Sequence, residues 1–332
     1  MNTNAIRNEL AKKITNINAG SFEKIAIQVF QYQATYNPLY AEYLQLIQKP
    51  ITSVKTLEDI PFLPIAFFKS HEVKSGKWES LQIFTSSGTT GSATSRHHVR
   101  NLDWYQQVSM QCFKPFYGDV SEYCTLALLP SYLERSGSSL VFMADYFIRQ
   151  SKYKSSGFFL HDLESLSNTL QECRQQKIPV ILLGVSFALL DFAELFPTDL
   201  KDSIIMETGG MKGRRAEITR PELHEILNTA FNTSLIHSEY GMTELLSQAY
   251  SRGNGLFYPG PTMKILTREI TDPLHVQKPG KNGAINIIDL GNLDTISFIA
   301  SEDLGKVYED GSFEILGRLD ASDVRGCNLM VV

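Results

Sequence analysis

The pattern that decides the fold is Val180-Ile181-Leu182-Leu183-Gly184, a short apolar run that is followed by a helical pattern from Phe187 to Phe196. An apolar run of this length without alternating polar residues is typical of a strand buried on both faces. Similar runs occur at 123–129, 203–208 and 234–238. Because helical patterns separate these runs, the sequence predicts an α/β fold with a largely parallel sheet and flanking helices.

The two ends of the chain follow other patterns. Residues 1–48 carry apolar residues at helical spacing, with a break at Gly20 and with Ser21 as the expected N-cap of the next helix. From about residue 256, short strand patterns separated by turn residues dominate. We therefore predict an α/β core with N-terminal helices over 1–255, a β-rich subdomain over 256–318, and a hinge with a short tail over 319–332.

Composition and charge exclude several classes of protein. The 332-residue chain is 43% hydrophobic, and its net charge of −5 without a long Lys/Arg cluster predicts no nucleic-acid partner. No apolar run reaches membrane-spanning length and the first residues lack the apolar core of a signal peptide, so we expect a cytoplasmic protein without a membrane span. The four cysteines form no CxxC pair, which argues against a structural zinc site or a disulfide framework.

A loop rich in hydroxyl groups and glycine spans residues 85–94, with the sequence Thr-Ser-Ser-Gly-Thr-Thr-Gly-Ser-Ala-Thr. It follows a predicted strand at 80–84, and ligands commonly bind at strand ends in α/β proteins. Glycine lets a ligand approach the backbone, and hydroxyl and N–H groups donate hydrogen bonds to phosphate oxygens. The loop is therefore a candidate anion site, although a flexible Ser/Thr/Gly linker has the same composition.

Two further glycine-containing turns follow predicted strands. They are Thr208-Gly209-Gly210-Met211-Lys212 and Tyr240-Gly241-Met242-Thr243-Glu244. Because neighbouring parallel strands end at one edge of a sheet, these turns and the loop can line one crevice. Glu244 could then bind Mg²⁺, which usually takes one or two carboxylates together with ligand phosphates. Taken alone, Glu244 equally fits a solvated carboxylate at the start of a helix.

Asp303 and Arg318 add a second set of polar groups. Asp303 is a good acceptor for sugar hydroxyls, and an arginine such as Arg318 can bind phosphate oxygens in a bidentate manner. Each residue alone fits an ordinary surface ion pair of small energetic worth. Together with the three turns, however, the two residues favour a nucleotide with bound Mg²⁺.

In their order along the chain and in their residues, these motifs resemble those of the adenylate-forming superfamily, which includes acyl-CoA synthetases, firefly luciferase and adenylation domains. Ser86-Ser87-Gly88-Thr89-Thr90-Gly91 matches its phosphate-binding loop, and Tyr240-Gly241-Met242-Thr243-Glu244 matches its Tyr-Gly-x-Thr-Glu motif. Asp303 matches the aspartate that holds the ribose, and Gly317-Arg318-Leu319-Asp320 matches its hinge motif. The resemblance implies the N-terminal core of such an enzyme, with ATP and Mg²⁺ as cofactors.

Most of the chain is similar to the acyl-protein synthetases of bacterial bioluminescence operons (LuxE type), which are related to phenylacetate–CoA ligases. The similarity includes residues 61–73, the turn at 208–213, and Arg325-Gly326-Cys327-Asn328-Leu329-Met330. It implies ATP-driven activation of a fatty acid as acyl-AMP and transfer of the acyl group to a cysteine at the position of Cys327. The group would then pass to an acyl-accepting protein such as a fatty-acid reductase or an acyl carrier.

Two departures from the superfamily pattern bear on this mechanism. Many members have a lysine three residues after the last glycine of the phosphate loop, where this chain has Thr94, and Arg96 is the nearest cation. The chain ends at Val332, soon after Asp320, so we expect the usual C-terminal domain to be absent. A tail with its own thiol at Cys327 fits that expectation better than a CoA ligase mechanism, although a free cysteine often packs simply as a small hydrophobic residue.

The resemblance implies a role for each candidate residue. Cys327 would accept the acyl group, Thr243 would contact the α-phosphate, and Glu244 would ligate Mg²⁺. Asp320 would be the hinge. The remaining residues would bind the nucleotide through its β- and γ-phosphates (Ser86, Ser87, Gly88, Thr89, Thr90, Gly91), its adenine (Gly209, Gly210, Tyr240) and its ribose (Asp303, Arg318), and Gly241 would be a further cofactor-binding residue.

Three other functions are open. An acyl- or aryl-CoA ligase would use CoA as the acceptor. A serine hydrolase would use Ser186 with His237 as its base, since Gly184-Val185-Ser186-Phe187-Ala188 is close to a Gly-x-Ser-x-Gly nucleophile elbow. This alternative lacks the last glycine and leaves 85–94 and 240–244 without a role. A non-catalytic acyl or nucleotide carrier would bind ATP without releasing pyrophosphate.

Overall fold

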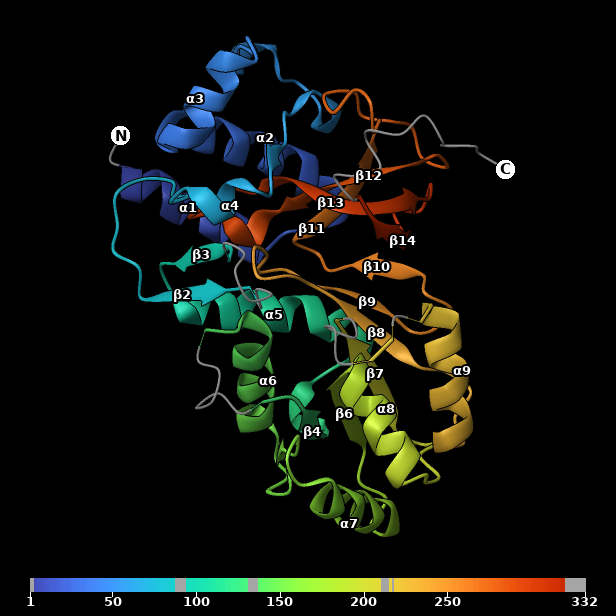
Figure 1. Cartoon of the computed structure of the whole chain (residues 1–332). Coiled ribbons are helices and arrows are strands. Elements are labelled where there is room, and N and C mark those ends of the chain that lie inside the picture. The colour runs from blue at the N-terminus through green and yellow to red at the C-terminus, as the bar shows by residue number, and fades with distance from the viewer. Residues whose placement is uncertain (1–2, 87–93, 131–136, 210–214, 217, 320–332) are drawn as a thin grey trace. The chain divides into compact units, whose positions relative to one another are not determined.

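The computed structural model describes residues 3–86, 94–130, 137–209, 215–216 and 218–319 (Figure 1). The chain divides into two compact units, one formed by 1–76 together with 263–332 and the other by 77–262. The boundaries expected from sequence, after 255 and after 318, stay predictions. None of the helices in the described ranges is long and apolar enough to cross a membrane.

The first unit combines the N-terminal helices with the strands that follow residue 262. The helical region expected over 1–48 consists of three helices. The second of these begins after Asn18, whose side chain accepts from the amide of Ser21, while the Ser21 hydroxyl accepts from the amide of Asn18. The expectation that Ser21 is the N-cap is therefore wrong: Asn18 is the cap, and Ser21 completes a reciprocal capping box three residues later.

The elements of the first unit, in chain order, are α1 (Thr3–Thr15), α2 (Ala19–Tyr36), α3 (Pro38–Leu46), the 3-10 turns Ile51–Ser53 and Leu57–Asp59, β1 (Leu63–Pro64), α4 (Phe67–Ser70), β11 (Met263–Arg268), β12 (Asn282–Asp289), the 3-10 turn Leu290–Asn292, β13 (Phe298–Val307) and β14 (Phe313–Arg318). The strands β11, β12, β13 and β14 pair in that order, each antiparallel to the next, and β1 pairs parallel to β13.

Aromatic packing holds α2 and α3 on this sheet. The ring of Phe298 in β13 lies 6.1 Å from that of Phe30 and 6.4 Å from that of Tyr40, between centroids. Burial of such rings is the main source of stability in a core. A buried side-chain amide also fixes the position of α2. Gln33 of α2 donates to the carbonyl of Asn292 at 3.0 Å and accepts from the amide of Ser297 at 2.9 Å.

The second unit contains the parallel sheet that the apolar runs predict. Its strands pair in the order β10-β9-β8-β7-β6-β4-β5, with parallel pairs from β5 to β8 and antiparallel pairs at β9 and β10. Two short strands, β2 and β3, form a separate hairpin. The predicted α/β class, with a mostly parallel sheet, flanking helices and a β-rich part, is confirmed.

The elements of the second unit, in chain order, are β2 (Gln82–Thr85), β3 (Arg96–Val99), α5 (Leu102–Tyr117), the 3-10 turn Val120–Glu122, β4 (Cys124–Leu128), α6 (Ser139–Gln150), β5 (Gly157–Phe158), α7 (Leu163–Gln175), β6 (Val180–Val185), α8 (Ser186–Leu195), β7 (Ile204–Thr208), α9 (Arg220–Phe231), β8 (His237–Tyr240), β9 (Ala249–Ser251) and β10 (Phe257–Pro259).

The strand β6 turns directly into α8, and the glycine at 184 lets the helix pack closely on it. A Cβ atom at Gly184 would lie 2.8 Å from Cγ of Leu189 and 3.0 Å from Cβ of Leu128. Any larger residue would therefore push α8 away from the sheet. In Figure 1 this strand-to-helix turn lies beside β7, whose end carries the second polar turn.

One strand lies further along the chain than its apolar run suggests. The sequence predicts a strand at 234–238, but β8 spans His237–Tyr240 and begins where Met206 of β7 pairs with His237. Leu235 is 44% exposed and lies outside the sheet. The strand therefore places Ser238 and Glu239, two polar residues, in buried positions.

Candidate functional site

The hydroxyl-rich loop begins and ends on the β2–β3 hairpin of the second unit. The two strands pair in register from Gln82 opposite Val99 to Thr85 opposite Arg96. At this end of the ladder the amide of Ser86 donates to the carbonyl of Ser95 at 3.2 Å, and the amide of Ser95 donates to Oγ of Ser86 at 3.0 Å. Ser86 thus lies at the base of the loop. The remaining candidates lie outside the described residues: Ser87, Gly88, Thr89, Thr90 and Gly91.

The hairpin is joined to the third motif by a buried histidine. Nδ1 of His97 in β3 lies 2.8 Å from the carbonyl oxygen of Thr243. Since a carbonyl oxygen only accepts, Nδ1 carries the proton in this pair. Burial lowers the pKa of His97 to about 4, although the hydrogen bond to Thr243 opposes that shift, so the ring is neutral near pH 7. The base of the loop and the Thr243–Glu244 turn therefore lie together in this unit.

The third motif starts at the end of β8 and is tightly packed. The ring of Tyr240 meets that of Phe257 edge to face, with centroids 5.9 Å apart. A Cβ atom at Gly241 would lie 2.5 Å from Oε1 of Glu239, so a side chain there would collide with a buried carboxyl group. Glu244 is 6% exposed. A side chain at the second position of the motif would therefore require the Glu239 carboxyl group to move.

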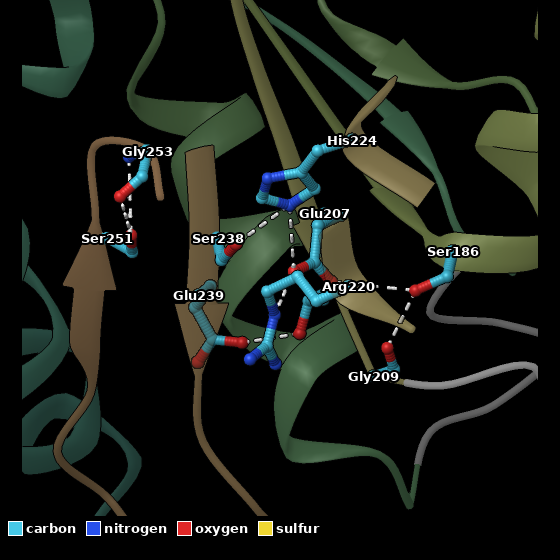
Figure 2. Close-up of polar contacts among 10 residues, drawn as sticks. Ser186, Glu207, Gly209, Arg220, His224, Ser238, Glu239, Ser251 and Gly253 are labelled. Carbon is cyan, nitrogen blue, oxygen red and sulfur yellow. Dashed lines mark hydrogen bonds and ion pairs between the residues drawn. The ribbon is translucent and has the colours of Figure 1, made fainter. Parts of the chain in front are cut away.

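The second motif begins at Gly209, directly after β7. Gly209 has a φ of +68°, which favours glycine. Oγ of Ser186, the first residue of α8, donates to the carbonyl oxygen of Gly209 at 2.7 Å (Figure 2). The start of α8 therefore fixes the beginning of this turn. The other adenine candidate in the turn, Gly210, lies outside the described residues.

A buried carboxylate, that of Glu207, lies in β7 two residues before Gly209. Oε1 of Glu207 accepts from Nε of Arg220 at 3.0 Å and lies 3.6 Å from Nε2 of His224 (Figure 2). Burial opposes ionisation of Glu207, but the hydrogen bond from His224 and the charge of Arg220 outweigh it and hold its pKa below the ordinary value. Glu207 is therefore an ionised, paired group at pH 7. Removing one partner of such a buried pair is strongly destabilising.

A second buried carboxyl group links the second and third motifs. Oγ1 of Thr208 donates to Oε2 of Glu239 at 2.5 Å. Burial raises the pKa of Glu239 to about 7, with the charge of Glu207 adding to it and the bond from Thr208 opposing it. Glu239 is therefore partly protonated at neutral pH, and its carboxyl group rests against the backbone of Gly241.

Asp303 and Arg318 are neighbours in the first unit. They face each other across β13 and β14, where Nε of Arg318 lies 3.8 Å from Oδ1 of Asp303. Arg318 also pairs with Glu302 at 3.2 Å, and its side chain is 71% exposed. An exposed pair of this kind contributes little to stability. The Arg318 side chain is thus largely exposed at the end of β14, whereas that of Asp303 is 15% exposed.

The serine hydrolase alternative finds no triad geometry in the described ranges. The hydroxyl of Ser186, 2% exposed, donates to Gly209 instead of to a histidine. The histidine expected as its base, His237, has Nδ1 within 3.1 Å of the hydroxyl oxygen of Tyr117. Burial, with the charges of Arg252 and His224, lowers the pKa of His237 to about 4. Ser186 and His237 therefore make separate structural contacts.

No group of three or more His, Cys, Asp or Glu side chains that could hold a metal occurs in the described ranges. Mg²⁺ keeps several waters and binds through one or two carboxylates plus ligand phosphates, and Glu244 is a carboxylate that the third motif could offer to it. Cys327 lies outside the described residues.

Sequence reasoning gave no role to His97 or Glu239, which connect the motifs, or to Glu207, which pairs with Arg220 and His224 of α9. The pair His97-His98 follows the loop inside a short strand, and that was the only signal for a buried histidine. Glu207 and Glu239 are each the next-to-last residue of a buried strand, where a single acidic residue gives no recognisable sequence pattern. Their partners lie far away in the sequence, as with His97 and Thr243, which are 146 positions apart.

The buried titratable groups predict a loss of stability in mild acid. The folded pKa of His97 is about 4, whereas an unfolded histidine has a pKa of about 6.5. The unfolded chain therefore takes up this proton first, and about 3 kcal/mol of stability present above pH 6.5 is lost as the pH falls toward 4. His237 acts in the same direction. Glu239 acts oppositely, because its raised pKa gives stability below about pH 4.5 that is lost as the pH rises through 7.

Urea unfolding between pH 4 and pH 8 measures these contributions. His97→Asn removes one titrating ring, so its free energy of unfolding is expected to fall less steeply than that of the wild type below pH 6.5. Glu239→Gln removes the opposing group and should make the fall steeper. Parallel pH profiles for the wild type and His97→Asn would contradict the assignment of the acid sensitivity to His97.

Comparison with known proteins gave matches only at the level of structure. No protein-family model matched the sequence, and no curated protein did. ATP-bound MatB from Rhodopseudomonas palustris is similar with a TM-score of 0.53 and 16% identity, over 71% of this chain and 47% of that chain. The chain thus spans about half the length of MatB.

A second group of similar structures covers more of the chain. A 2-hydroxyisobutyryl-CoA ligase in the postadenylation state, in complex with 2-HIB-AMP, matches with a TM-score of 0.65 and 14% identity, over 91% of this chain and 69% of that chain. An open conformation of the same ligase with 2-HIB-AMP and CoA gives 0.64 and 14%, over 93% and 78%. At these identities the comparison establishes the fold, which is that expected for the core of an adenylate-forming enzyme.

Proposed function

We propose that this chain activates a carboxylic acid by adenylation. The carboxylate oxygen attacks the α-phosphorus of ATP, a bond to this oxygen forms, and the bond to the β-phosphate oxygen breaks to release pyrophosphate. The observation that carries the proposal is the hydrogen bond from His97 to Thr243, since it places the base of the hydroxyl-rich loop beside the turn that contains Thr243 and Glu244. The ligase fold of the similar structures supports the same reaction.

Each part of the nucleotide has proposed partners. The loop that begins at Ser86 would hold the β- and γ-phosphates through hydroxyl and N–H donors. Glu244 would ligate Mg²⁺, which neutralises phosphate charge, and Thr243 would contact the α-phosphate. The adenine would lie between Tyr240 and the Gly209 turn. Asp303 and Arg318 are proposed as ribose-binding residues. Because little covalent chemistry is asked of the protein, positioning and charge neutralisation would supply most of the rate.

The acyl acceptor is proposed to be a thiol of the protein itself. In this step the sulfur of Cys327 attacks the carbonyl carbon of acyl-AMP, AMP leaves, and the thiol proton is released. A fatty acid is the proposed substrate, the cytoplasm the proposed location, and an acyl-accepting protein such as a reductase or carrier the proposed next partner, all from the resemblance to acyl-protein synthetases. CoA is the alternative acceptor, and it is favoured by a similar ligase that was solved with 2-HIB-AMP and CoA.

An ATP–pyrophosphate exchange assay tests the first step without reference to the acceptor. We expect labelled pyrophosphate to enter ATP only when a carboxylic acid is present, in a panel of fatty, aryl and hydroxy acids. The acid that gives the largest kcat/KM identifies the substrate class. Exchange that is absent with every acid, or that is equal with and without acid, would remove the adenylation proposal and leave the carrier alternative.

A further inference from the structure

The side chains of Thr208 and Glu239 meet where the pairing of β7 with β8 ends. Thr208 is the last residue of β7, Glu239 is the next-to-last residue of β8, and the two lie opposite each other in the last pair of the ladder. Both residues are buried, and Oγ1 of Thr208 donates to Oε2 of Glu239 at 2.5 Å. A side-chain hydrogen bond therefore joins the two strands at their last paired position.

The same carboxyl group touches the turn that follows β8. A Cβ atom at Gly241 would lie 2.5 Å from Oε1 of Glu239, so this oxygen lies against the backbone of Gly241. One oxygen of Glu239 thus contacts the residue that precedes Gly209, and the other contacts the second residue of the third motif. The carboxyl group therefore lies at the start of both turns between which the adenine is proposed to bind.

Glu239 is buried without the cationic partners that Glu207 has. Glu207 pairs with Arg220 and His224, whereas no cation among the described residues lies within ion-pair distance of Glu239. Figure 2 shows the two carboxyl groups on neighbouring strands. Burial raises the pKa of Glu239 to about 7, so ionisation of this group disfavours the folded state. Because carboxyl groups with such shifts cluster at functional sites, a role in the site explains Glu239 better than a contribution to stability does.

We propose that Glu239 is a positioning residue of the proposed nucleotide site, which holds the backbone at Gly209 and Gly241 in the relative position that the adenine requires. The proposal rests on the proposed adenylation function and deepens it, because Glu239 would act through the two turns without touching the nucleotide. Backbone pairing fixes the strands themselves, and the carboxyl group would fix the residues that follow the last pair. Ser186 also holds Gly209, through its carbonyl oxygen, so loss of the carboxyl contact alone should have a partial effect.

The expected effect is on nucleotide binding more than on the chemical step. Loss of an interaction that serves the substrate and the transition state equally raises KM and leaves kcat unchanged. A contact that only places the two turns around the adenine is of this kind, because the adenine takes no part in the bonds that form and break. The KM for ATP should therefore change while kcat and the KM for the acid change little.

Four substitutions separate the hydrogen bond from the space that the side chains fill. Thr208→Val removes the donor and keeps the shape, whereas Thr208→Ser keeps the donor. Glu239→Leu removes both oxygens, whereas Glu239→Gln keeps an acceptor on a side chain of the same length. Thr208→Val combined with Glu239→Gln leaves a neutral amide without its donor in place of a carboxyl group, so the double variant replaces Thr208→Val if the single variant does not fold.

Ser151→Ala is a control for the loss of a short hydrogen bond elsewhere in the same unit. Oγ of Ser151 donates to the carbonyl oxygen of Tyr123 at 2.6 Å. Tyr123 directly precedes β4, so this bond lies at the amino end of a parallel strand, whereas Thr208 lies at the carboxyl end of β7. The control therefore separates a local effect on the nucleotide site from a general loss of stability.

The exchange assay gives the first readout. We expect Thr208→Val and Glu239→Leu to raise the KM for ATP by about threefold to tenfold, which is the loss of binding that one buried hydrogen bond typically causes. Thr208→Ser and Glu239→Gln should restore most of this value, and Ser151→Ala should match the wild type. Equal KM values for ATP in Thr208→Val and Thr208→Ser would overturn the proposal, as would an equally large rise in Ser151→Ala.

Calorimetric binding of AMP gives a readout that does not depend on the reaction, and melting temperatures establish that each variant is folded. We expect AMP to bind more weakly to Thr208→Val than to Thr208→Ser. If the wild type shows no pyrophosphate exchange with any acid, this difference in AMP binding would still support the positioning role, although the adenylation function would be removed. AMP binding of equal strength in the two variants would overturn the positioning role even if the wild type catalyses exchange.

Discussion

Glu244→Ala is expected to lower carboxylate-dependent ATP–pyrophosphate exchange by about 100-fold or more. A bound metal ion that neutralises charge on a reacting phosphoryl group is worth several kcal/mol of transition-state stabilisation, and each 1.36 kcal/mol corresponds to about tenfold in rate. Glu244 is the carboxylate of the proposed Mg²⁺ site, in the residue after the carbonyl that His97 holds. Removing it would leave the phosphate charge to the loop hydroxyls and N–H groups alone.

Two control variants test whether a loss of exchange in Glu244→Ala is due to the missing charge at Glu244. Glu244→Gln preserves the shape of a side chain that is 6% exposed, so it separates loss of charge from loss of packing. Glu225→Ala removes an exposed carboxylate on α9 and should leave exchange unchanged. Melting temperatures establish that each variant is folded. Near-normal exchange in Glu244→Gln at every Mg²⁺ concentration would remove the metal role of Glu244.

The parallel sheet could be predicted from sequence because a strand buried on both faces consists of consecutive apolar residues. The runs at 180–184 and 203–208 become β6 and β7, each with a shift of one residue at one end. The strand predicted at 234–238 is displaced in the structure for a physical reason. Its apolar residues, Leu235 and Ile236, precede the strand, whereas pairing with β7 selects polar residues up to Tyr240. Backbone pairing across a sheet can outweigh local apolar pattern.

Sequence alone could propose only those parts of the candidate site whose residues lie close together in the chain. Turns and loops can be recognised from a few consecutive residues, because they are rich in glycine and hydroxyl side chains. For this reason the loop at 85–94 and the turn at Tyr240–Glu244 could be proposed from the sequence. The groups that connect them could not. Whether His97 donates to Thr243, or Thr208 to Glu239, depends on how strands are ordered and registered, and that order is a property of the whole sheet.

Cys327→Ser is expected to abolish thioester-linked acyl label on the protein while leaving pyrophosphate exchange intact. Exchange reports only the formation and reversal of acyl-AMP, which precede the thiol. The label depends on a sulfur nucleophile, and serine is far less nucleophilic than cysteine near neutral pH. Protein incubated with ATP, Mg²⁺ and a radiolabelled acid would be denatured and treated with neutral hydroxylamine, which releases thioesters. The wild type should lose its label in this treatment, and the variant should carry none.

Two controls decide between a protein thiol and CoA as the acceptor. Cys112→Ser is the matched control, because Cys112 is a buried free cysteine whose sulfur lies 3.3 Å from Oγ1 of Thr262, a contact that a serine hydroxyl can keep. Its label should equal that of the wild type. Addition of CoA tests the alternative: acyl-CoA formed equally by the wild type and Cys327→Ser, with no label on either protein, would assign the thiol step to CoA. Hydroxylamine-sensitive label that persists in Cys327→Ser would place the acyl group on another cysteine.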